Sequence, residues 1–251
     1  MKIVVVGGTG LIGSAVVETL RADGHDAVAA APSTGVDTLT GRGLAEALAG
    51  AQVLVDVSNS PSFADADVLD FFTRSTTNLL AAGRAAGIGH YVALSVVGAD
   101  RLPDSGYLRA KVAQEELITG SGLPFTILRA TQFFEFLGAI ADGATTGTTV
   151  AIPPAPFQPV AAADVSAALT EAATGAPTHG GADLAGPQQR PMDVFVREAL
   201  AAHADPRTVV ADAAARYFGA DVTGGELVPA GAARTAPTSF TDWLTDRAFT
   251  R

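Results

Sequence analysis

Three polar side chains near the middle of the chain have the types and spacing needed to reduce a carbonyl group. Ser95 ends an apolar run, and Tyr107 and Lys111 follow it, four residues apart. Residues four apart share one face of a helix, so the phenol and the ammonium are expected to be neighbours. A tyrosine beside a substrate oxygen can donate the proton that carbonyl reduction requires. The pattern therefore predicts Ser95, Tyr107 and Lys111 as catalytic residues.

A lysine charge can bring the pKa of a tyrosine towards neutrality. At about 4 Å and an effective dielectric constant of about 20, it attracts a phenolate by on the order of 4 kcal/mol. That energy corresponds to a fall of roughly three in the tyrosine pKa. Ser95 would hydrogen-bond the substrate oxygen as charge develops on it. The alternative is a surface aromatic at Tyr107 and a solvated charge at Lys111, because the Y-x-x-x-K pattern is common by chance.

A glycine-rich run near the start of the sequence is suited to hold a dinucleotide. It satisfies G-x-G-x-x-G directly after an apolar run at residues 2–6. Glycine permits the tight turn, the close approach of a pyrophosphate to the backbone, and the close packing of helix on strand. Free N–H groups at the start of the following helix attract the pyrophosphate. The predicted cofactor contacts are Gly7, Gly8, Thr9, Gly10, Leu11, Ile12 and Gly13.

The choice between NAD and NADP depends on the end of the second expected strand. An acidic residue there would hold the ribose 2′-hydroxyl and repel a 2′-phosphate. Residues 29–35 read Ala-Ala-Ala-Pro-Ser-Thr-Gly, and the next acid is Asp37. Ser33 and Thr34 can donate hydrogen bonds to a phosphate, although no arginine lies in the loop and Arg42 is distant. We expect NADP (NADPH) in preference to NAD, with simple turn chemistry as the alternative role of Ser33 and Thr34.

Alternating strands and helices position these groups. Strands are predicted at residues 2–6, 27–31, 36–39, 52–57, 90–95 and 125–129, and helices at 14–22, 44–48, 67–86, 107–119 and 133–141. This alternation predicts an α/β Rossmann fold with a doubly wound parallel sheet. Ligands bind at the carboxyl ends of the strands in such sheets, and Ser95 lies at one of these ends.

The pattern changes after about residue 142, where Gly, Thr and Pro become frequent. We expect residues 1–150 to form the NAD(P)-binding core. Residues 151–251 are expected to form a smaller C-terminal substrate-side lobe, continuous with the core. The substrate-pocket prediction comprises Val96, Val97, Phe133, Phe134, Phe136 and Phe157. The aromatic side chains suggest an apolar carbonyl substrate, with core packing as the alternative for each of them.

Composition excludes several classes of function. The chain has no cysteine, which rules out disulfides, thiolate metal sites and cysteine nucleophiles. Its formal net charge of −10 argues against a nucleic-acid partner. The four histidines lack metal-ligand spacing, so no metal is expected. Without a long apolar stretch or a signal sequence, we expect a cytoplasmic protein that does not enter membranes and is a monomer or homodimer.

The chain resembles a short-chain dehydrogenase/reductase, most closely the atypical NmrA-like group of NAD(P)-binding proteins. The likeness rests on the glycine run, residues 94–98, the Tyr107-x-x-x-Lys111 pattern, and residues 125–130 with the aromatic segment after them. It implies that Ser95, Tyr107 and Lys111 match the family's catalytic serine, tyrosine and lysine, and that Lys111 also binds the nicotinamide ribose. It further implies cofactor contacts from Val57, Ser58, Asn59, Ala130 and Thr131.

Three functions remain open from the sequence. The first is an NADPH-dependent oxidoreductase that reduces an apolar carbonyl compound. The second is an NADP-binding redox sensor without turnover, since the NmrA-like group contains such members. The third is an epimerase-like enzyme acting on a sugar nucleotide, whose diphosphate needs basic residues. The second half of the chain holds Arg190, Arg197, Arg207, Arg216 and Arg234, without an obvious cluster.

Overall fold

The computed structural model describes residues 1–245, and its internal contacts divide the chain into two compact units. Unit 1 comprises residues 1–95, 106–129 and 165–182. Unit 2 comprises, among the described residues, 96–105, 130–164 and 183–245. The boundary expected near residue 150 falls inside a segment of unit 2, and residues 246–251 of the expected lobe lie outside the described residues.

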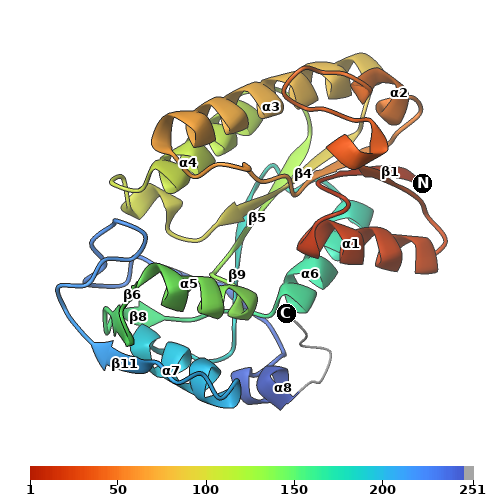
Figure 1. Cartoon of the computed structure of the whole chain (residues 1–251). Helices are drawn as coiled ribbons and strands as arrows, with labels where there is room; N and C mark the ends of the chain where they lie inside the picture. The colour runs from red at the N-terminus through yellow and green to blue at the C-terminus, as the bar shows by residue number, and fades with distance from the viewer. Residues whose placement is uncertain (246–251) are drawn as a thin grey trace. The chain divides into compact units, whose positions relative to one another are not determined.

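Strands and helices alternate along unit 1, as Figure 1 shows. The elements are β1 (Lys2–Val6), α1 (Leu11–Ala22), β2 (Asp26–Ala30), α2 (Leu44–Leu48), β3 (Val53–Asp56), α3 (Asp65–Ala86), β4 (His90–Val96), α4 (Gly106–Thr119), β5 (Phe125–Ala130), α6 (Ala162–Thr174) and β9 (Gly180–Ala185), several of which end in unit 2.

The strands form a seven-stranded sheet in the order β12-β9-β5-β4-β3-β1-β2, where β12 is Arg234–Thr235. β1 pairs in parallel with both β2 and β3, and β3 pairs in parallel with β4. Ile3, Val4 and Val5 of β1 are almost fully buried, as expected of a parallel strand covered on both faces. The prediction of an α/β Rossmann fold is confirmed.

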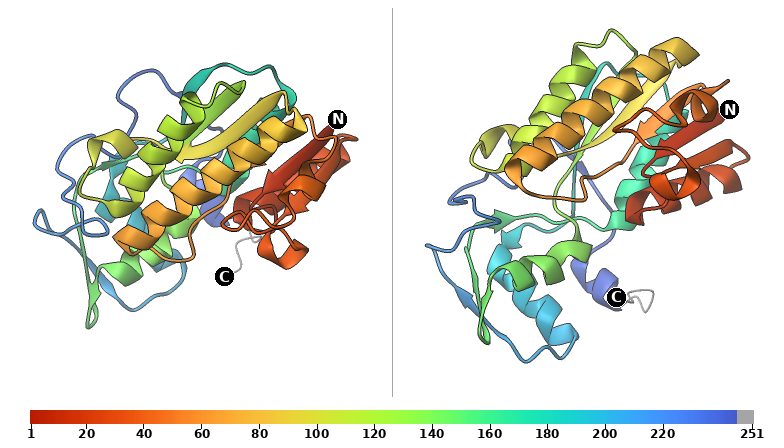
Figure 2. Two further views of the ribbon diagram at one scale, coloured as in Figure 1. Left: turned by 90° about the horizontal axis from the view of Figure 1, so that it is seen from above. Right: turned by 45° about the horizontal axis from the view of Figure 1, so that its top comes forward.

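Helices α3 and α4 lie side by side along the sheet in Figure 2. α3 buries one face, which includes Val68, Phe72 and Leu79. Its first turn carries two aspartates, which suit the helix dipole, and Gly87 ends the helix with a φ of 70°. No helix within residues 1–245 combines the length and the apolar character that crossing a bilayer requires.

The strand predicted at residues 36–39 is wrong. Gly35 leaves the turn Pro32–Thr34 with a φ of 86°, and the backbone then folds back on itself. The Asp37 carboxylate accepts hydrogen bonds from the N–H groups of Leu39 and Thr40 at 2.9 and 3.3 Å. Such a side-chain-to-backbone turn replaces the ladder that a strand would need.

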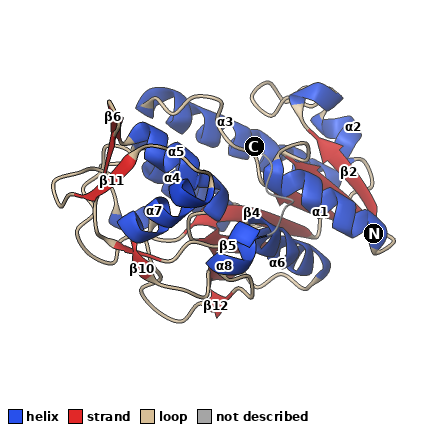
Figure 3. Cartoon of the chain, turned by 60° about the horizontal axis from the view of Figure 1, so that its bottom comes forward, coloured by secondary structure: helices blue, strands red, loops and turns tan. Residues whose placement is uncertain are grey.

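Unit 2 has its own small sheets, which Figure 3 shows in red, and it also has an aromatic core. The helix predicted at residues 133–141 begins as a 3₁₀ turn at Phe134–Phe136 and continues as α5 (Leu137–Gly143). Phe134, Phe195, Phe240 and Trp243 pack with ring centroids 5.0 to 6.5 Å apart. The other elements are β6 (Thr145–Thr146), β7 (Thr149–Ile152), β8 (Pro156–Phe157), β10 (Arg190–Pro191), α7 (Met192–Ala202), β11 (Thr208–Ala211) and α8 (Phe240–Thr245).

Candidate functional site

The glycine run of unit 1 forms a backbone cradle between β1 and α1. Gly7 has a φ of 78°, and a Cβ atom there would lie 2.7 Å from the Val57 carbonyl oxygen. A Cβ atom on Gly13 would overlap the Gly7 carbonyl oxygen. α1 begins at an N-cap glycine, Gly10, with no side-chain cap and no acid in its first turn. The first N–H groups of this helix are therefore open to an anion.

The segment after β3 lies against this cradle. The Val57 N–H donates to the Val6 carbonyl at 3.0 Å, and the Ser58 N is 2.9 Å from a Cβ built on Gly7. The Ser58 hydroxyl donates to Asp56 at 2.6 Å, while Asn59 is exposed and accepts from the Ser60 N–H at 3.0 Å. The structure thus brings residues 57–58 next to Gly7, both from the predicted cofactor set.

Ser33 and Thr34 have different roles in the turn after β2. The Thr34 hydroxyl donates to the Ala29 and Ala31 carbonyls at 3.1 and 3.0 Å and accepts from the Ala31 N–H at 2.9 Å. It therefore holds the turn together. Ser33 is exposed beside it. Of the two predicted donors, Ser33 is the one whose hydroxyl is not committed to this turn.

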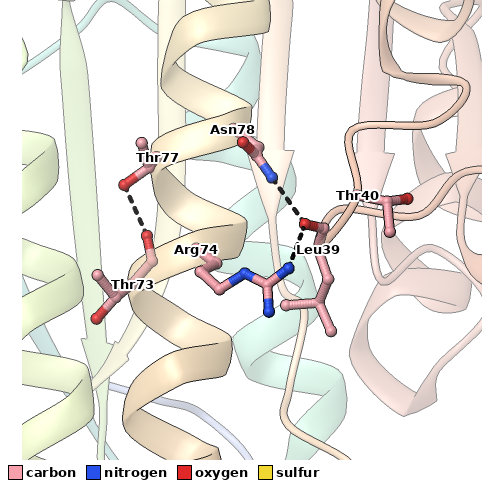
Figure 4. A pocket seen from close by; sticks show the side chains of 6 residues that line it. All are labelled: Leu39, Thr40, Thr73, Arg74, Thr77 and Asn78. Atoms are coloured by element: carbon pink, nitrogen blue, oxygen red, sulfur yellow. Dashed lines mark hydrogen bonds between the residues drawn. The ribbon is translucent and has the colours of Figure 1, made fainter.

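A surface depression of about 430 Å³ lies between the loop after β2 and α3 (Figure 4). Its polar side chains hold the loop, because Arg74 and Asn78 donate to the Leu39 carbonyl at 3.3 and 3.1 Å. Arg74 also pairs with Asp70 at 3.1 Å. None of the predicted site residues lines this depression; its lining is Leu39, Thr40, Thr73, Arg74, Thr77 and Asn78.

Ser95 lies near the carboxyl end of β4 and is buried, with 2% of its surface exposed. Its hydroxyl has no hydrogen-bond partner among residues 1–245. Leaving a buried hydroxyl unpaired costs about 1–3 kcal/mol, so such a group needs an explanation. A ligand oxygen at the end of the strand would supply the missing partner.

Tyr107 packs between two phenylalanines at the start of α4. Its ring centroid lies 5.6 Å from that of Phe63 and 6.0 Å from that of Phe72. Phe63 is 63% exposed, so an apolar surface open to solvent lies beside the phenol. Burial raises the pKa of Tyr107 to about 12. This direction is opposite to the fall expected from a neighbouring lysine.

The position of Lys111 explains why the Tyr107 pKa does not fall, because the Lys111 ammonium is hydrogen-bonded to other groups. The Nζ atom donates to the Leu94 carbonyl at 2.8 Å and to the Gln114 side-chain oxygen, and it lies 4.5 Å from the Phe72 ring centroid. Lys111 is 3% exposed, and burial lowers its pKa to about 8, against the opposing charges of Asp56 and Glu115.

Sequence reasoning missed the polar groups around this lysine. Asp56, Tyr91 and Gln114 are buried, and the Tyr91 hydroxyl and the Gln114 amide both donate hydrogen bonds to Asp56. The acid in the otherwise apolar run 53–57 was the available signal, because a buried carboxylate requires partners.

Unit 2 contains the remaining predicted residues. The Val97 N–H donates to the Ala130 carbonyl at 2.9 Å, and the buried Thr131 hydroxyl has no partner among residues 1–245. Phe133 stacks on the half-exposed Phe136 at 5.3 Å. Phe134 and Phe157 are fully buried in the aromatic core, and Val96 is half-buried. The structure places Phe134 and Phe157 in packing positions; the substrate-pocket role of all six residues stays a prediction.

The residues of unit 1 fit a dinucleotide. The cradle excludes side chains where a pyrophosphate would approach, and the start of α1 offers free N–H groups. The Ser95 hydroxyl, which no other described residue bonds, adds a polar group at a strand end.

Comparison with known proteins agrees with this geometry. A family model described as NAD(P)H-binding matches residues 7–175. A photosystem II assembly factor, Ycf39 of Cyanophora paradoxa, is 26% identical over 151 residues, which cover 55% of this chain and 47% of that protein. The chain thus spans about half the length of that curated relative.

Solved structures show the same fold. MoeE5 with UDP-glucose and NAD has a TM-score of 0.74 at 19% identity and covers 100% of both chains. UDP-glucose 4-epimerase of Thermus thermophilus, complexed with NAD, has a TM-score of 0.69 at 17% identity, covering 100% of this chain and 94% of that one. An NADPH-dependent quinone oxidoreductase of Escherichia coli, complexed with NADPH, has a TM-score of 0.66 at 21% identity, covering 84% and 77%.

Proposed function

Because the chain belongs to the NAD(P)H-binding family, we propose that it is an NADPH-dependent reductase of apolar carbonyl compounds. The observation that carries this proposal is the buried Ser95 hydroxyl, which has no hydrogen-bond partner in the described part of the chain and lies in the unit that also holds the glycine cradle. A substrate oxygen held by Ser95 would be polarised at the point where negative charge develops.

Tyr107 is the proton donor in this proposal. A pKa of about 12 keeps Tyr107 a protonated phenol at physiological pH, so its proton is available, but burial also makes it a weaker acid than an exposed tyrosine. When bound, the reduced dinucleotide would supply a hydride to the carbonyl carbon. The Tyr107 proton goes to the oxygen, so the product is the alcohol. Lys111 contributes a buried positive charge one helical turn further along α4.

NADPH is proposed in preference to NADH. No acid follows β2 until Asp37, whose carboxylate is occupied by backbone N–H groups. The exposed Ser33 can donate to a 2′-phosphate, whereas Thr34 shapes the turn. An apolar substrate is supported by Phe63, which exposes most of its ring beside Tyr107.

A second candidate is an NADP-binding protein without turnover. It is favoured by the position of Lys111, whose ammonium contacts Leu94, Gln114 and Phe72. The relative from Cyanophora paradoxa, an assembly factor by name, also fits a binding role.

An epimerase-like function is less well supported, although two of the structural neighbours are named as epimerases. Four of the arginines in unit 2 that could bind a substrate diphosphate pair with carboxylates of the same unit. Arg197 pairs with Asp193, and Arg216 with Asp221, both at 2.9 Å. Arg190 and Arg207 also form ion pairs.

The test measures NADPH consumption against a panel of aromatic and aliphatic aldehydes, ketones and quinones. Tyr107→Phe is expected to lose about 10²–10⁴-fold in kcat while still binding NADPH. Tyr217→Phe, which removes a phenol hydroxyl in unit 2, serves as the matched control. Tight NADPH binding without turnover of any compound would support the second candidate. A fully active Tyr107→Phe variant would remove Tyr107 from the mechanism.

A further inference from the structure

A buried carboxylate in unit 1 joins the end of β3 to β4 and α4. Asp56 is 1% exposed, and its Oδ2 atom accepts hydrogen bonds from the Tyr91 hydroxyl and the Gln114 side-chain amide, both at 2.9 Å. Its Oδ1 atom accepts from the Ser58 hydroxyl at 2.6 Å and from the Ser58 N–H at 3.1 Å. Each oxygen of this almost fully buried carboxylate therefore accepts two hydrogen bonds from protein groups.

Gln114 connects this carboxylate to Lys111, and its amide can face only one way. A lysine ammonium donates and cannot accept, whereas a carboxylate accepts and cannot donate. The Gln114 oxygen therefore faces the Lys111 Nζ, and the Gln114 NH₂ group faces Asp56. One amide thus joins a buried positive charge to a buried negative charge.

We propose that Asp56, acting through Gln114, is a positioning residue that holds Lys111 against the Leu94 carbonyl and couples it to Ser58. The proposal rests on the proposed function, because it gives Lys111 and the segment 57–59 their roles beside the cofactor. A single carboxylate then fixes both the lysine and the segment that lies next to the glycine cradle.

Of the two negative charges that favour the protonated form of Lys111, that of Asp56 acts more strongly. Burial lowers the pKa of Lys111 to about 8, and the charges of Asp56 and Glu115 act in the opposite direction, Asp56 the more strongly. Glu115 on α4 is itself paired with Arg129, at 3.0 Å from its Nε. α3 presents the Phe72 ring and β4 presents the Tyr91 hydroxyl, which is bound to Asp56.

Replacing Asp56 by asparagine places a hydrogen-bond donor where the Gln114 NH₂ group needs an acceptor. The new amide is neutral, and an NH₂ group in the place of Oδ2 would face the Gln114 NH₂ group, donor against donor. Turning Gln114 round relieves that conflict but directs its NH₂ group at Lys111, which can accept only when neutral. The Asp56→Asn variant is therefore expected to favour neutral Lys111.

The sequence makes this testable, because the chain contains only two lysines, Lys2 and Lys111. Protein labelled with ¹³C-lysine gives two side-chain NMR signals, and a Lys2→Arg variant assigns them. The whole chain is titrated without cofactor, and NADPH binding is measured separately by calorimetry. Thr126→Val is the control, since it removes a buried hydroxyl of unit 1 that bonds His90 and Thr178.

Asp56→Asn is expected to lower the titration midpoint of Lys111 by about one pH unit or more, with the Lys2 signal unchanged. NADPH binding should weaken by roughly three- to tenfold, because the Ser58 segment loses its charged anchor. Gln114→Met keeps the charges of Asp56 and Lys111 but removes the hydrogen-bonded link between them, so it should also lower the Lys111 midpoint. This variant provides the test if Asp56→Asn does not fold. Gln114→Glu should raise the midpoint.

An unchanged Lys111 midpoint in both Asp56→Asn and Gln114→Met, equal to that of Thr126→Val, overturns the proposal. Because the titration needs neither cofactor nor substrate, its result is separate from that of the activity assay. A protein that shows the expected shifts but reduces no carbonyl compound would retain the positioning role and lose the proposed reaction.

Discussion

The glycine cradle and the Ser95–Tyr107–Lys111 group lie in the same unit but are specified differently. The cradle is built from backbone, and each close contact follows from the lack of a side chain at Gly7 and Gly13. The lysine is placed by partners far away in the sequence, such as Leu94 and Phe72. A site made of backbone can be predicted from a local pattern. A site made of side chains depends on everything packed around it.

The sharpest way to break the cradle is Gly13→Ala. The added methyl group would overlap the Gly7 carbonyl oxygen, so the turn must move. NADPH affinity should fall by at least about 100-fold, or about 2.7 kcal/mol. Calorimetry measures the affinity, with Gly10→Ala as the control. A Cβ on Gly10 meets its nearest atom at 3.3 Å, so the loss there should be only a few-fold. Equal losses in both variants would contradict a purely steric role.

The placement of Lys111 can be tested through the pH dependence of folding stability. Its pKa in the folded protein, about 8, lies below the ordinary 10.5, so the unfolded chain binds more protons between these values. Stability should therefore rise with pH from 8 to 10, by about 2 kcal/mol. Urea unfolding of Lys111→Met should lack this rise relative to the wild type. Parallel curves for the two proteins would show that folding does not lower the pKa of Lys111.

A smaller effect is expected on the preference for NADPH over NADH, which we place at the turn after β2. Ser33→Asp places a negative charge in the turn after β2, where it would repel a 2′-phosphate. NADPH affinity should fall by about tenfold, or 1.4 kcal/mol, with NADH affinity unchanged or improved. Thr34→Val is the matched variant, and it should weaken both dinucleotides alike because it loosens the turn. Loss of both dinucleotides in Ser33→Asp would argue against a 2′-phosphate contact.

The smallest expected effect concerns the substrate side of Tyr107. Phe63→Ala removes the exposed ring beside the phenol. KM for aromatic carbonyl compounds should rise by about three- to tenfold, within the range for a lost apolar contact, while kcat for small aliphatic compounds stays the same. Leu69→Ala, another exposed apolar residue in unit 1, is the control. Equal changes for aromatic and aliphatic substrates would remove Phe63 from recognition.

The sequence by itself determined the Rossmann class, the cradle and most of the element boundaries. Buried strands such as residues 2–6, and glycines between strand and helix, can be recognised from neighbouring residues alone. The strand predicted at 36–39 failed because the Asp37 carboxylate, a local side chain, captured the backbone N–H groups.

Only the tertiary structure decided the electrostatics of the candidate catalytic group. The expected fall in the Tyr107 pKa assumed that Lys111 faces it, as their helical spacing suggests. In the folded protein Phe63 and Phe72 pack against the Tyr107 ring, while Leu94 and Gln114 accept hydrogen bonds from the Lys111 ammonium. Spacing along a helix fixes which residues share a face. Hydrogen bonds and desolvation, set by distant segments, fix where each charge lies and how it titrates.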